Sequence, residues 1–134
     1  MKFGYLRLPK GISLPAIPVE IRSPGHTETI VVYALVDSGA DHCTLPRTVA
    51  EKIGISEIAS GKHHKARGVG GDIDCYVHPV EMKVGGSWIA LPAAFSPSYD
   101  GWPLLGRLGF FDKFRVCIDQ SKEQIELHPI AGKK

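Results

Sequence analysis

Hydrophobic and polar residues alternate over short runs along much of the chain, which is the pattern of β-strands. The clearest strand signal is instead a continuous apolar run, TIVVYALV at residues 29–36, where β-branched and aromatic side chains predict a buried strand. It runs directly into Asp37-Ser38-Gly39, whose residue types favour a turn. The pattern therefore places a carboxylate at the end of an apolar strand.

Two segments have a helical pattern instead. In residues 44–55, Leu45, Val49 and Ile53 recur every four positions, so a short helix is expected there. The apolar segment 104–114 predicts a second short helix near the C-terminus, although it contains two glycines.

The N-terminal part of the chain, about residues 1–24, is expected to be extended. It contains prolines at positions 9, 15, 18 and 24, and proline lacks the N–H that a central strand would donate. We therefore predict an edge strand or an arm, which is a candidate dimer element. Glycine pairs and polar turns separate the remaining strands, so the sequence predicts one mainly β domain over residues 1–134.

Composition narrows the possible functions. The chain has 134 residues, a net charge of +2 and scattered Lys and Arg, so no nucleic-acid partner is expected. Three cysteines cannot all pair within one chain, and we expect reduced thiols in the cytoplasm. Arg7 and Pro9 interrupt the apolar N-terminus, and no window approaches the ~20 apolar residues that span a bilayer, so neither a signal peptide nor a membrane partner is expected.

Three motifs follow one another in the sequence: LVDSGAD at 35–41, GVGG at 68–71 and LLGRLGFF at 104–111. With them the chain resembles the retropepsin-like aspartic proteases, single-domain enzymes that work as homodimers, and it is similar to bacterial and cellular members rather than to viral ones. The resemblance covers about residues 15–128. It implies a closed, barrel-like β domain with a flap hairpin at about 62–78 and one or two short helices, including a C-terminal helix at about 104–114.

The resemblance also implies an activity. Asp37 would be the catalytic residue and would face Asp37 of a second copy, so that the two carboxylates share one proton and activate a water molecule. The substrate would be a peptide or an unfolded protein, and neither a cofactor nor a metal ion is expected.

Residues around Asp37 would support the active-site loop. Ser38 would hydrogen-bond across the dimer axis, Gly39 would allow the tight turn, and Ala40 completes the loop. Ser38 alone is equally consistent with a local turn hydrogen bond. Asp41 and Arg107 would form a two-pronged ion pair, whereas without the resemblance they would be independent surface charges.

The glycine-rich segment Gly68, Val69, Gly70 and Gly71 would form the tip of the flap that closes over bound peptide. Taken without the resemblance, the same residues describe an ordinary hairpin turn. The preceding sequence KHHKAR makes the approach to this flap basic, which affects the expected substrate preference.

Other candidate sites are weaker. By the resemblance, His42 and Cys43, just past the loop, would line substrate subsites, whereas Cys43 taken alone is equally consistent with a buried small hydrophobic residue. Adjacent strand residues point to opposite faces, so the two do not form a nucleophile pair. Alternation also separates the members of a possible metal site, which would comprise His63, His64, Cys75 and His78.

Two rival enzyme functions for Asp37 do not fit the sequence. A phosphatase with a nucleophilic aspartate needs a second acid two residues later, where the chain has Gly39, and an actin-like ATPase needs a much longer chain. A retropepsin-like homodimer that binds peptides or partner proteins without cutting them remains an alternative. Its interface would involve the N-terminal arm or the strand at 123–130.

Overall fold

The computed structural model describes residues 1–131, and its fold is mainly β, as the sequence predicts. The helices are short: η1 (Pro9–Gly11), α1 (Arg47–Lys52) and η2 (Ile58–Ser60). The strands are β1 (Lys2–Gly4), β2 (Leu6–Arg7), β3 (Ser13–Leu14), β4 (Ala16–Arg22), β5 (Ile30–Val36), β6 (Cys43–Leu45), β7 (Lys62–Gly68), β8 (Gly71–Val84), β9 (Ser87–Phe95), β10 (Leu104–Leu105), β11 (Phe114–Asp119) and β12 (Gln124–Pro129).

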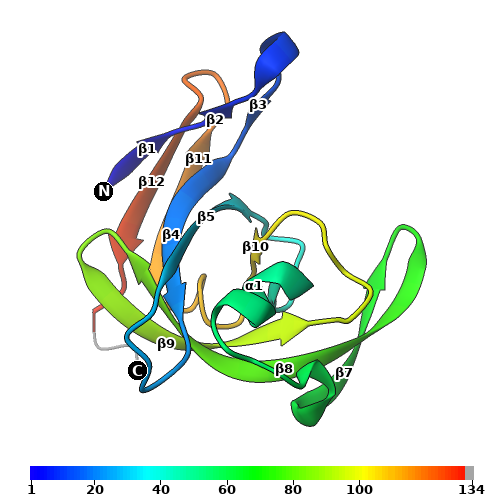
Figure 1. Ribbon diagram of the computed structural model, residues 1–134. Coiled ribbons are helices and arrows are strands. Elements are labelled where there is room, and N and C mark those ends of the chain that lie inside the picture. Colours follow the sequence, from blue (N-terminus) through cyan, green and yellow to red (C-terminus); the bar gives the residue numbers. More distant parts are fainter. Residues whose placement is uncertain (132–134) are drawn as a thin grey trace.

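Six strands close into a barrel in the order β4-β5-β10-β6-β9-β8, and β8 pairs back with β4 (Figure 1). Strand β10 runs parallel to β5 and antiparallel to β6, so it lies between the strands on either side of the Asp37 turn. The long strand β8 continues past the barrel and pairs with β7 as a projecting hairpin.

The barrel interior is filled by apolar side chains from most of its strands. Burying each large aliphatic or aromatic side chain contributes about 1.5–3 kcal/mol, which makes this core the main source of stability. The helix α1 adds Val49 and Ala50 to the core. The largest fully buried side chains include Ile17, Ile21, Leu45, Met82, Phe95, Leu105 and Phe110.

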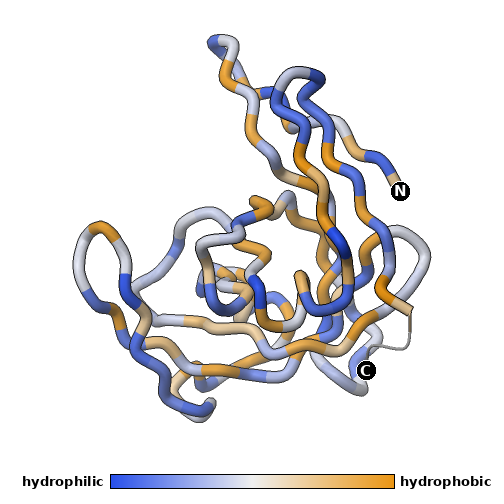
Figure 2. The backbone as a smooth tube through the Cα atoms, turned by 180° about the vertical axis from the view of Figure 1, so that it is seen from behind, coloured by the Kyte–Doolittle hydropathy of each residue, from blue (hydrophilic) through white to orange (hydrophobic). Residues whose placement is uncertain are grey.

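A second sheet, in the order β1-β12-β11, joins the two ends of the chain. Figure 2 shows hydrophobic and hydrophilic residues alternating along its strands, and the inward Ile125 and Leu127 of β12 are fully buried. The small β2-β3 hairpin projects beyond this sheet. None of the helices among residues 1–131 is long and apolar enough to cross a membrane.

The prediction that residues 1–24 form an edge strand or arm is wrong for the part that forms β4. This strand pairs with β5 from Ala16 to Ile21 and with β8 at Glu20, Ile21 and Arg22. Pro18 is tolerated because it lies outside the stretch that pairs with β8, so the missing N–H is not needed there.

The predicted helix at 104–114 is also wrong. Residues 104 and 105 form β10, and the chain then runs through turns until β11 begins at Phe114. Gly109 has a φ of +94°, in the left-handed region that a right-handed helix excludes. The apolar spacing of this segment therefore reflects packing against the barrel rather than helical periodicity.

The other elements agree with the sequence more closely. The helix predicted within 44–55 is confirmed as α1, and Pro46 stands at its N-cap. The strand predicted at 29–36 is confirmed as β5, but it is not buried throughout, because Val31 is 64% exposed and Tyr33 is 46% exposed. One face of the strand is therefore open to solvent in its first half.

Candidate active site

Asp37 stands at the end of β5, where the backbone is held from two sides. The amide of Val36 donates to the carbonyl of Pro15 at 2.9 Å, and the amide of Asp37 donates to the carbonyl of Leu105 at 3.0 Å. Both neighbours belong to segments packed on the barrel. The position of the Asp37 main chain is therefore set by the fold rather than by a free loop.

The carboxylate of Asp37 is half-buried and has one local partner. Its Oδ1 accepts a hydrogen bond from the amide of Gly39 at 2.9 Å, and among residues 1–131 no other group hydrogen-bonds to it. A Cβ at position 39 would lie 3.2 Å from this same oxygen, so a larger residue there would push the carboxylate from its position. The second oxygen remains available to a ligand or water molecule.

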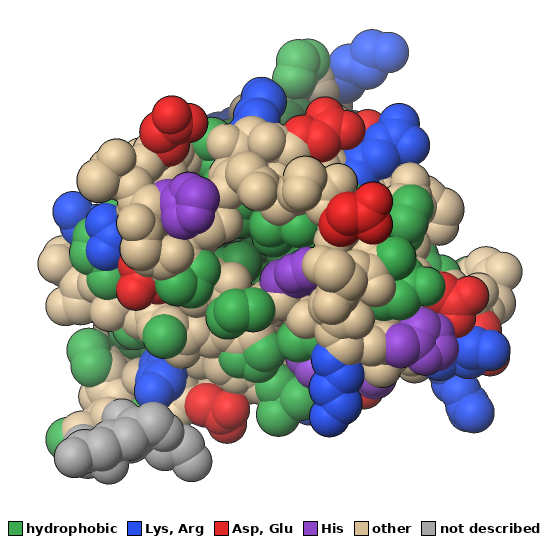
Figure 3. Space-filling view, turned by 60° about the horizontal axis from the view of Figure 1, so that its bottom comes forward, with side chains coloured by type: hydrophobic (Ala, Val, Ile, Leu, Met, Phe, Trp, Pro, Cys, Tyr) green, Lys and Arg blue, Asp and Glu red, His purple; other side chains and the backbone are tan. Residues whose placement is uncertain are grey.

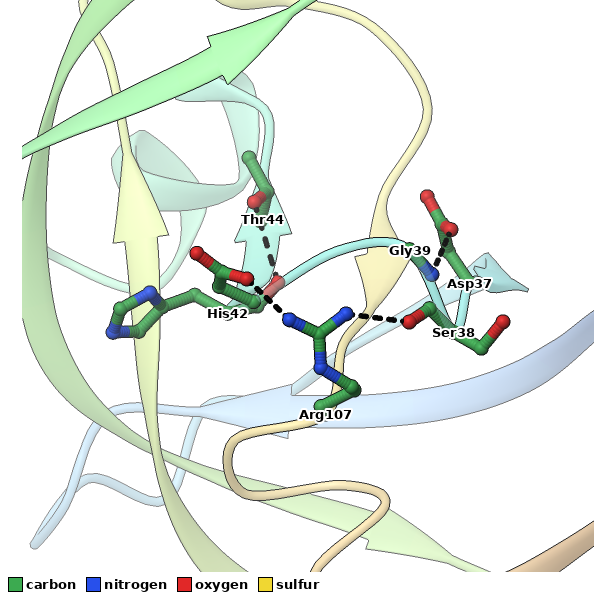
Figure 4. A network of polar contacts seen from close by, with 7 residues as sticks. Asp37, Ser38, Gly39, His42, Thr44 and Arg107 are labelled. Carbon is green, nitrogen blue, oxygen red and sulfur yellow. Dashed lines mark hydrogen bonds and ion pairs between the residues drawn. The ribbon is translucent and has the colours of Figure 1, made fainter.

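Arg107 links this turn to the segment after β10 (Figure 4). Its Nη1 donates to the carbonyl of Ser38 at 2.7 Å, and its Nη2 lies 2.5 Å from Oδ1 of Asp41. The expected ion pair is thus present, but it is not two-pronged, because the guanidinium divides its donors between a carbonyl and a carboxylate. This arrangement holds both ends of the Asp37–Asp41 loop.

The main chain at Gly106 is packed directly against the same loop. A Cβ at this position would lie 2.2 Å from the carbonyl oxygen of His42, far inside contact distance. The amide of Arg107 donates to Ala40 at 2.9 Å, and the amide of Leu108 donates to Asp41 at 2.7 Å. The Gly-Arg motif is therefore used to bring two backbone segments into direct contact.

A cleft of about 630 Å³ opens beside Asp37. It is lined by Asp37 and residues 39–42 of the loop, by β7 from His64 to Gly68, and by Tyr99 and Leu104. Figure 3 shows a face on which histidine and hydrophobic side chains gather around a hollow. Of the acidic side chains in residues 1–131, Asp37 and Asp41 line the cleft, and Asp41 is the one engaged by Arg107.

The predicted flap segment forms the hairpin of β7 and β8, with Gly68 paired to Gly71 at its end. Val69 is fully exposed at the tip, and a Cβ at Gly70 would meet no atom within 4 Å. Gly71 has a φ of +111°, a backbone conformation that favours glycine. The tip therefore has the geometry of a tight hairpin with little support from the rest of the chain.

Acidic residues of β8 offset much of the positive charge of KHHKAR. His63 Nε2 lies 2.8 Å from Oδ1 of Asp74, and Arg67 lies 3.9 Å from Asp72. The hydrogen bond from His63 lowers the pKa of Asp74 below its usual range. The flap approach is consequently less basic than its sequence suggests.

Tyr99 is a cleft residue that the sequence did not indicate. Its hydroxyl donates to the carbonyl of Trp102 at 2.5 Å, and burial together with the nearby charge of Asp37 raises its pKa. The phenol therefore remains neutral and fixed beside the aspartate. It lies in the irregular segment between β9 and β10, where neither periodicity nor a motif identifies it.

The alternative sites are separated by the fold. Cys43 is buried and accepts a hydrogen bond from the Gly106 amide at 3.4 Å, and burial raises the pKa of its thiol to about 11, so it is not an activated nucleophile. His63 pairs with Asp74, and His78 bonds the carbonyl of Ile58 at 2.7 Å. Across residues 1–131, no three His, Cys, Asp or Glu side chains are grouped so that they could hold a metal ion.

Comparisons with known proteins agree with this geometry. Among solved structures, a retropepsin-like aspartic protease from Rickettsia conorii is 16% identical with a TM-score of 0.64, covering 93% of this chain and 97% of its own. EIAV protease, solved in complex with the inhibitor HBY-793, is 23% identical with a TM-score of 0.51, covering 70% and 82%. No curated protein sequence matches the chain. The sequence model of the aspartyl protease family matches residues 17–110, more than two thirds of the chain. The chain therefore belongs to the aspartyl protease family.

Proposed function

We propose that this protein is an aspartic endopeptidase that uses Asp37 as its catalytic residue. The observation that carries the proposal is the position of the Asp37 carboxylate, which lines the cleft and has one oxygen without a protein partner among residues 1–131. The main chain beneath it is fixed by β10 and by Arg107. A carboxylate held in this way can bind and activate a water molecule.

A single copy is not sufficient for this chemistry. An aspartic protease needs two carboxylates that share one proton, because one acid must accept a proton while the other donates one. Within residues 1–131, the other cleft carboxylate is Asp41, which is committed to Arg107. We therefore infer that the second acid is Asp37 of another copy, and that the active form is a homodimer.

The reaction follows from the charge of such a pair. Two adjacent carboxylates do not both ionise readily, so one is protonated while the other is ionised. The ionised acid accepts a proton from water as the water oxygen attacks the scissile carbonyl. The protonated acid donates its proton to the carbonyl oxygen, and a tetrahedral diol forms without a covalent enzyme intermediate.

The remaining predicted site residues have supporting roles in this proposal. Ser38, Gly39 and Ala40 form the turn that presents the aspartate, and Asp41 with Arg107 braces it. The hairpin tip at 68–71 closes over the bound peptide and excludes water during the reaction. The substrate is a peptide or an unfolded protein, because an extended chain fits an open cleft beside a sheet edge.

The cysteines support a cytoplasmic setting for this activity. Cys43 and Cys75 are buried as free thiols, and Cys117 is free on the surface. Disulfides form and persist in oxidising compartments, whereas thiols remain reduced in the cytoplasm.

The variant Asp37→Asn tests the proposal. It replaces a carboxylate by an amide of the same shape, so we expect cleavage of a degenerate peptide library to fall to background while the fold is kept. Cleavage should be measured from about pH 4 to about pH 8, since the shared proton makes mildly acidic conditions favourable. Thermal unfolding and sizing of both proteins provide the control.

Two results would contradict the proposal. Cleavage by Asp37→Asn at the wild-type rate would remove Asp37 from the mechanism. If both proteins are inert at every pH and bind the same peptides equally well, the chain is a peptide-binding homodimer instead.

A further inference from the structure

Two histidines meet across the cleft at the base of the flap. His42 follows the Asp37–Asp41 loop, whereas His64 lies on β7, and the centroids of their rings are 4.6 Å apart at a tilt of 56°. Both side chains line the same cleft as Asp37. The pair therefore connects the rigid side of the cleft with the flap arm.

The ring nitrogens of this pair are available to a ligand. Within residues 1–131, none of them has a hydrogen-bond partner, and only Nδ1 of His42 is both buried and unpartnered. A proton on a buried, unpartnered nitrogen is costly, so the neutral His42 ring is expected to carry its proton on Nε2, the nitrogen that is not buried. The pair thus presents N–H donors to the cleft, and no group of residues 1–131 accepts a hydrogen bond from them.

On the flap side of the cleft, the charged side chains next to the pair are basic. Lys65 and Arg67, on the same strand as His64, also line the cleft. Asp41, the acid next to His42, is already held by Arg107.

Strand β8 faces the pair with a neutral group. Cys75, which pairs with His64 across the hairpin, is a buried thiol whose pKa is raised mainly by burial and also by Asp74. Asp74 itself is bonded to His63 and lies outside the lining of the cleft. Beside the two rings, a carboxylate would therefore meet open N–H donors and the charge of Lys65, whereas Arg67 is partly offset by Asp72 at 3.9 Å and Asp37 also lines the cleft.

We infer that His42 and His64 form a specificity subsite for an acidic side chain, so that the preferred peptides carry Glu or Asp where they pass the base of the flap. This inference rests on the proposed peptidase function and specifies its substrate class. The carboxylate of the peptide accepts hydrogen bonds from Nε2 of His42 and from the ring of His64. No covalent step is involved.

The selectivity has a defined pH dependence. Burial lowers the pKa of His42, and the neighbouring His64 lowers it further, while Asp41 acts in the opposite direction. A bound carboxylate favours the protonated form of His42, so preference for Glu grows as the pH falls from about 8 towards about 5. It disappears below about pH 4, where the glutamate of the peptide becomes protonated.

The test uses a peptide that the wild-type protein cleaves, prepared with Glu or Gln at one position at a time. At each pH, the ratio of kcat/KM for the two peptides is measured, which cancels the pH dependence of catalysis itself. We expect one position to favour Glu by roughly tenfold near pH 5, the effect of one or two charge-assisted hydrogen bonds. His64→Gln and His42→Gln should each bring this ratio close to one.

His63→Gln is the matched control, because His63 is the adjacent residue of β7 and bonds Asp74 outside the cleft. It should keep the wild-type ratio. An equal rate for Glu and Gln at every position would overturn the subsite while leaving the peptidase intact, whereas no cleavage of any peptide would instead reject the peptidase.

A binding measurement separates the subsite from turnover. In the Asp37→Asn background, the imidazole signals of His42 and His64 should move on addition of the Glu peptide, and the titration midpoint of His42 should rise. Signals that respond equally to the Gln peptide would contradict the inference.

Discussion

The Asp37–Asp41 loop and the tip of the flap hairpin are both turns beside one cleft, but they are held very differently. The loop receives hydrogen bonds from Arg107 through both its main chain and its side chain, and Gly106 packs against it with no room for a Cβ. At the flap tip, Val69 is fully exposed and a Cβ at Gly70 would touch nothing. The same residue type, glycine, serves close packing in one region and an open turn in the other.

This difference fits a division of tasks. A catalytic group must be held in position before the substrate arrives, since small displacements reduce the rate strongly. A flap must move to admit a peptide, and a hairpin tip with few contacts to the rest of the chain can do so. The comparison leads to mutational effects that should differ sharply between the two turns.

The largest expected effect is on stability, from Gly106→Ala. The new Cβ would lie 2.2 Å from the carbonyl oxygen of His42, so the two backbone segments must separate. We expect a loss of about 3 kcal/mol in the free energy of unfolding, measured by urea denaturation.

Gly70→Ala is the matched control, because its Cβ would enter open space and the φ of Gly70 is not in the positive range. Its unfolding free energy should change by less than about 0.5 kcal/mol. Equal losses for the two variants would remove the contrast between the turns.

Arg107→Lys should separate positioning from stability. The Asp41–Arg107 pair is about half exposed, with 60% and 52% of the two side chains accessible, so its net contribution is about 0–1 kcal/mol. Lysine cannot reach both Ser38 and Asp41 with the fork geometry of a guanidinium. We expect kcat/KM to fall by roughly tenfold with little change in unfolding free energy.

Arg22→Lys is the comparison for this variant. Arg22 bonds Glu81 at 2.7 Å and lies over the ring of Trp88, and it does not line the cleft. The Arg22→Lys variant should reduce stability modestly and leave kcat/KM unchanged. An unaltered kcat/KM in Arg107→Lys would show that the bracing is not needed for catalysis.

The smallest effect concerns the flap arm. The hydrogen bond from His63 lowers the pKa of Asp74, so the folded value lies below the unfolded one. The interaction therefore stabilises the hairpin above the unfolded pKa and is lost as pH falls through the folded pKa. NMR titration of the Asp74 carboxyl should show the lowered midpoint, and His63→Ala should return it towards the usual value.

The sequence predicted the strand leading to Asp37, the helix α1 and the hairpin at 68–71, because each has a local signal. These signals are an apolar run, apolar residues spaced four positions apart and a glycine-rich turn. Each involves only a few neighbouring residues, so packing against other strands does not change the local structure that it predicts. The three ordered motifs then indicated the fold and the candidate aspartate. They also suggested a role for Arg107. That its guanidinium bonds both the Ser38 carbonyl and the Asp41 carboxylate depends on how two loops approach in three dimensions, which the motifs do not show.

Long-range packing explains what was missed. Pro18 suggested an edge, but β8 pairs with only part of β4, so the proline avoids the paired stretch. The apolar residues at 104–114 suggested a helix, yet the positive φ of Gly109 and the contact at Gly106 require turns. Tyr99 and the His42–His64 contact join segments far apart in the chain, which no local pattern reveals.

The central claim is that two copies each contribute one Asp37, and mixed dimers test it most directly. Wild-type and Asp37→Asn chains are unfolded together and refolded in equal amounts, so that they pair at random, and peptidase activity is measured per wild-type chain. If both carboxylates are required, mixed dimers are inactive and this activity falls to about half of that of wild type refolded alone. Activity per wild-type chain that is unchanged or higher would show that one Asp37 is sufficient and would contradict the account.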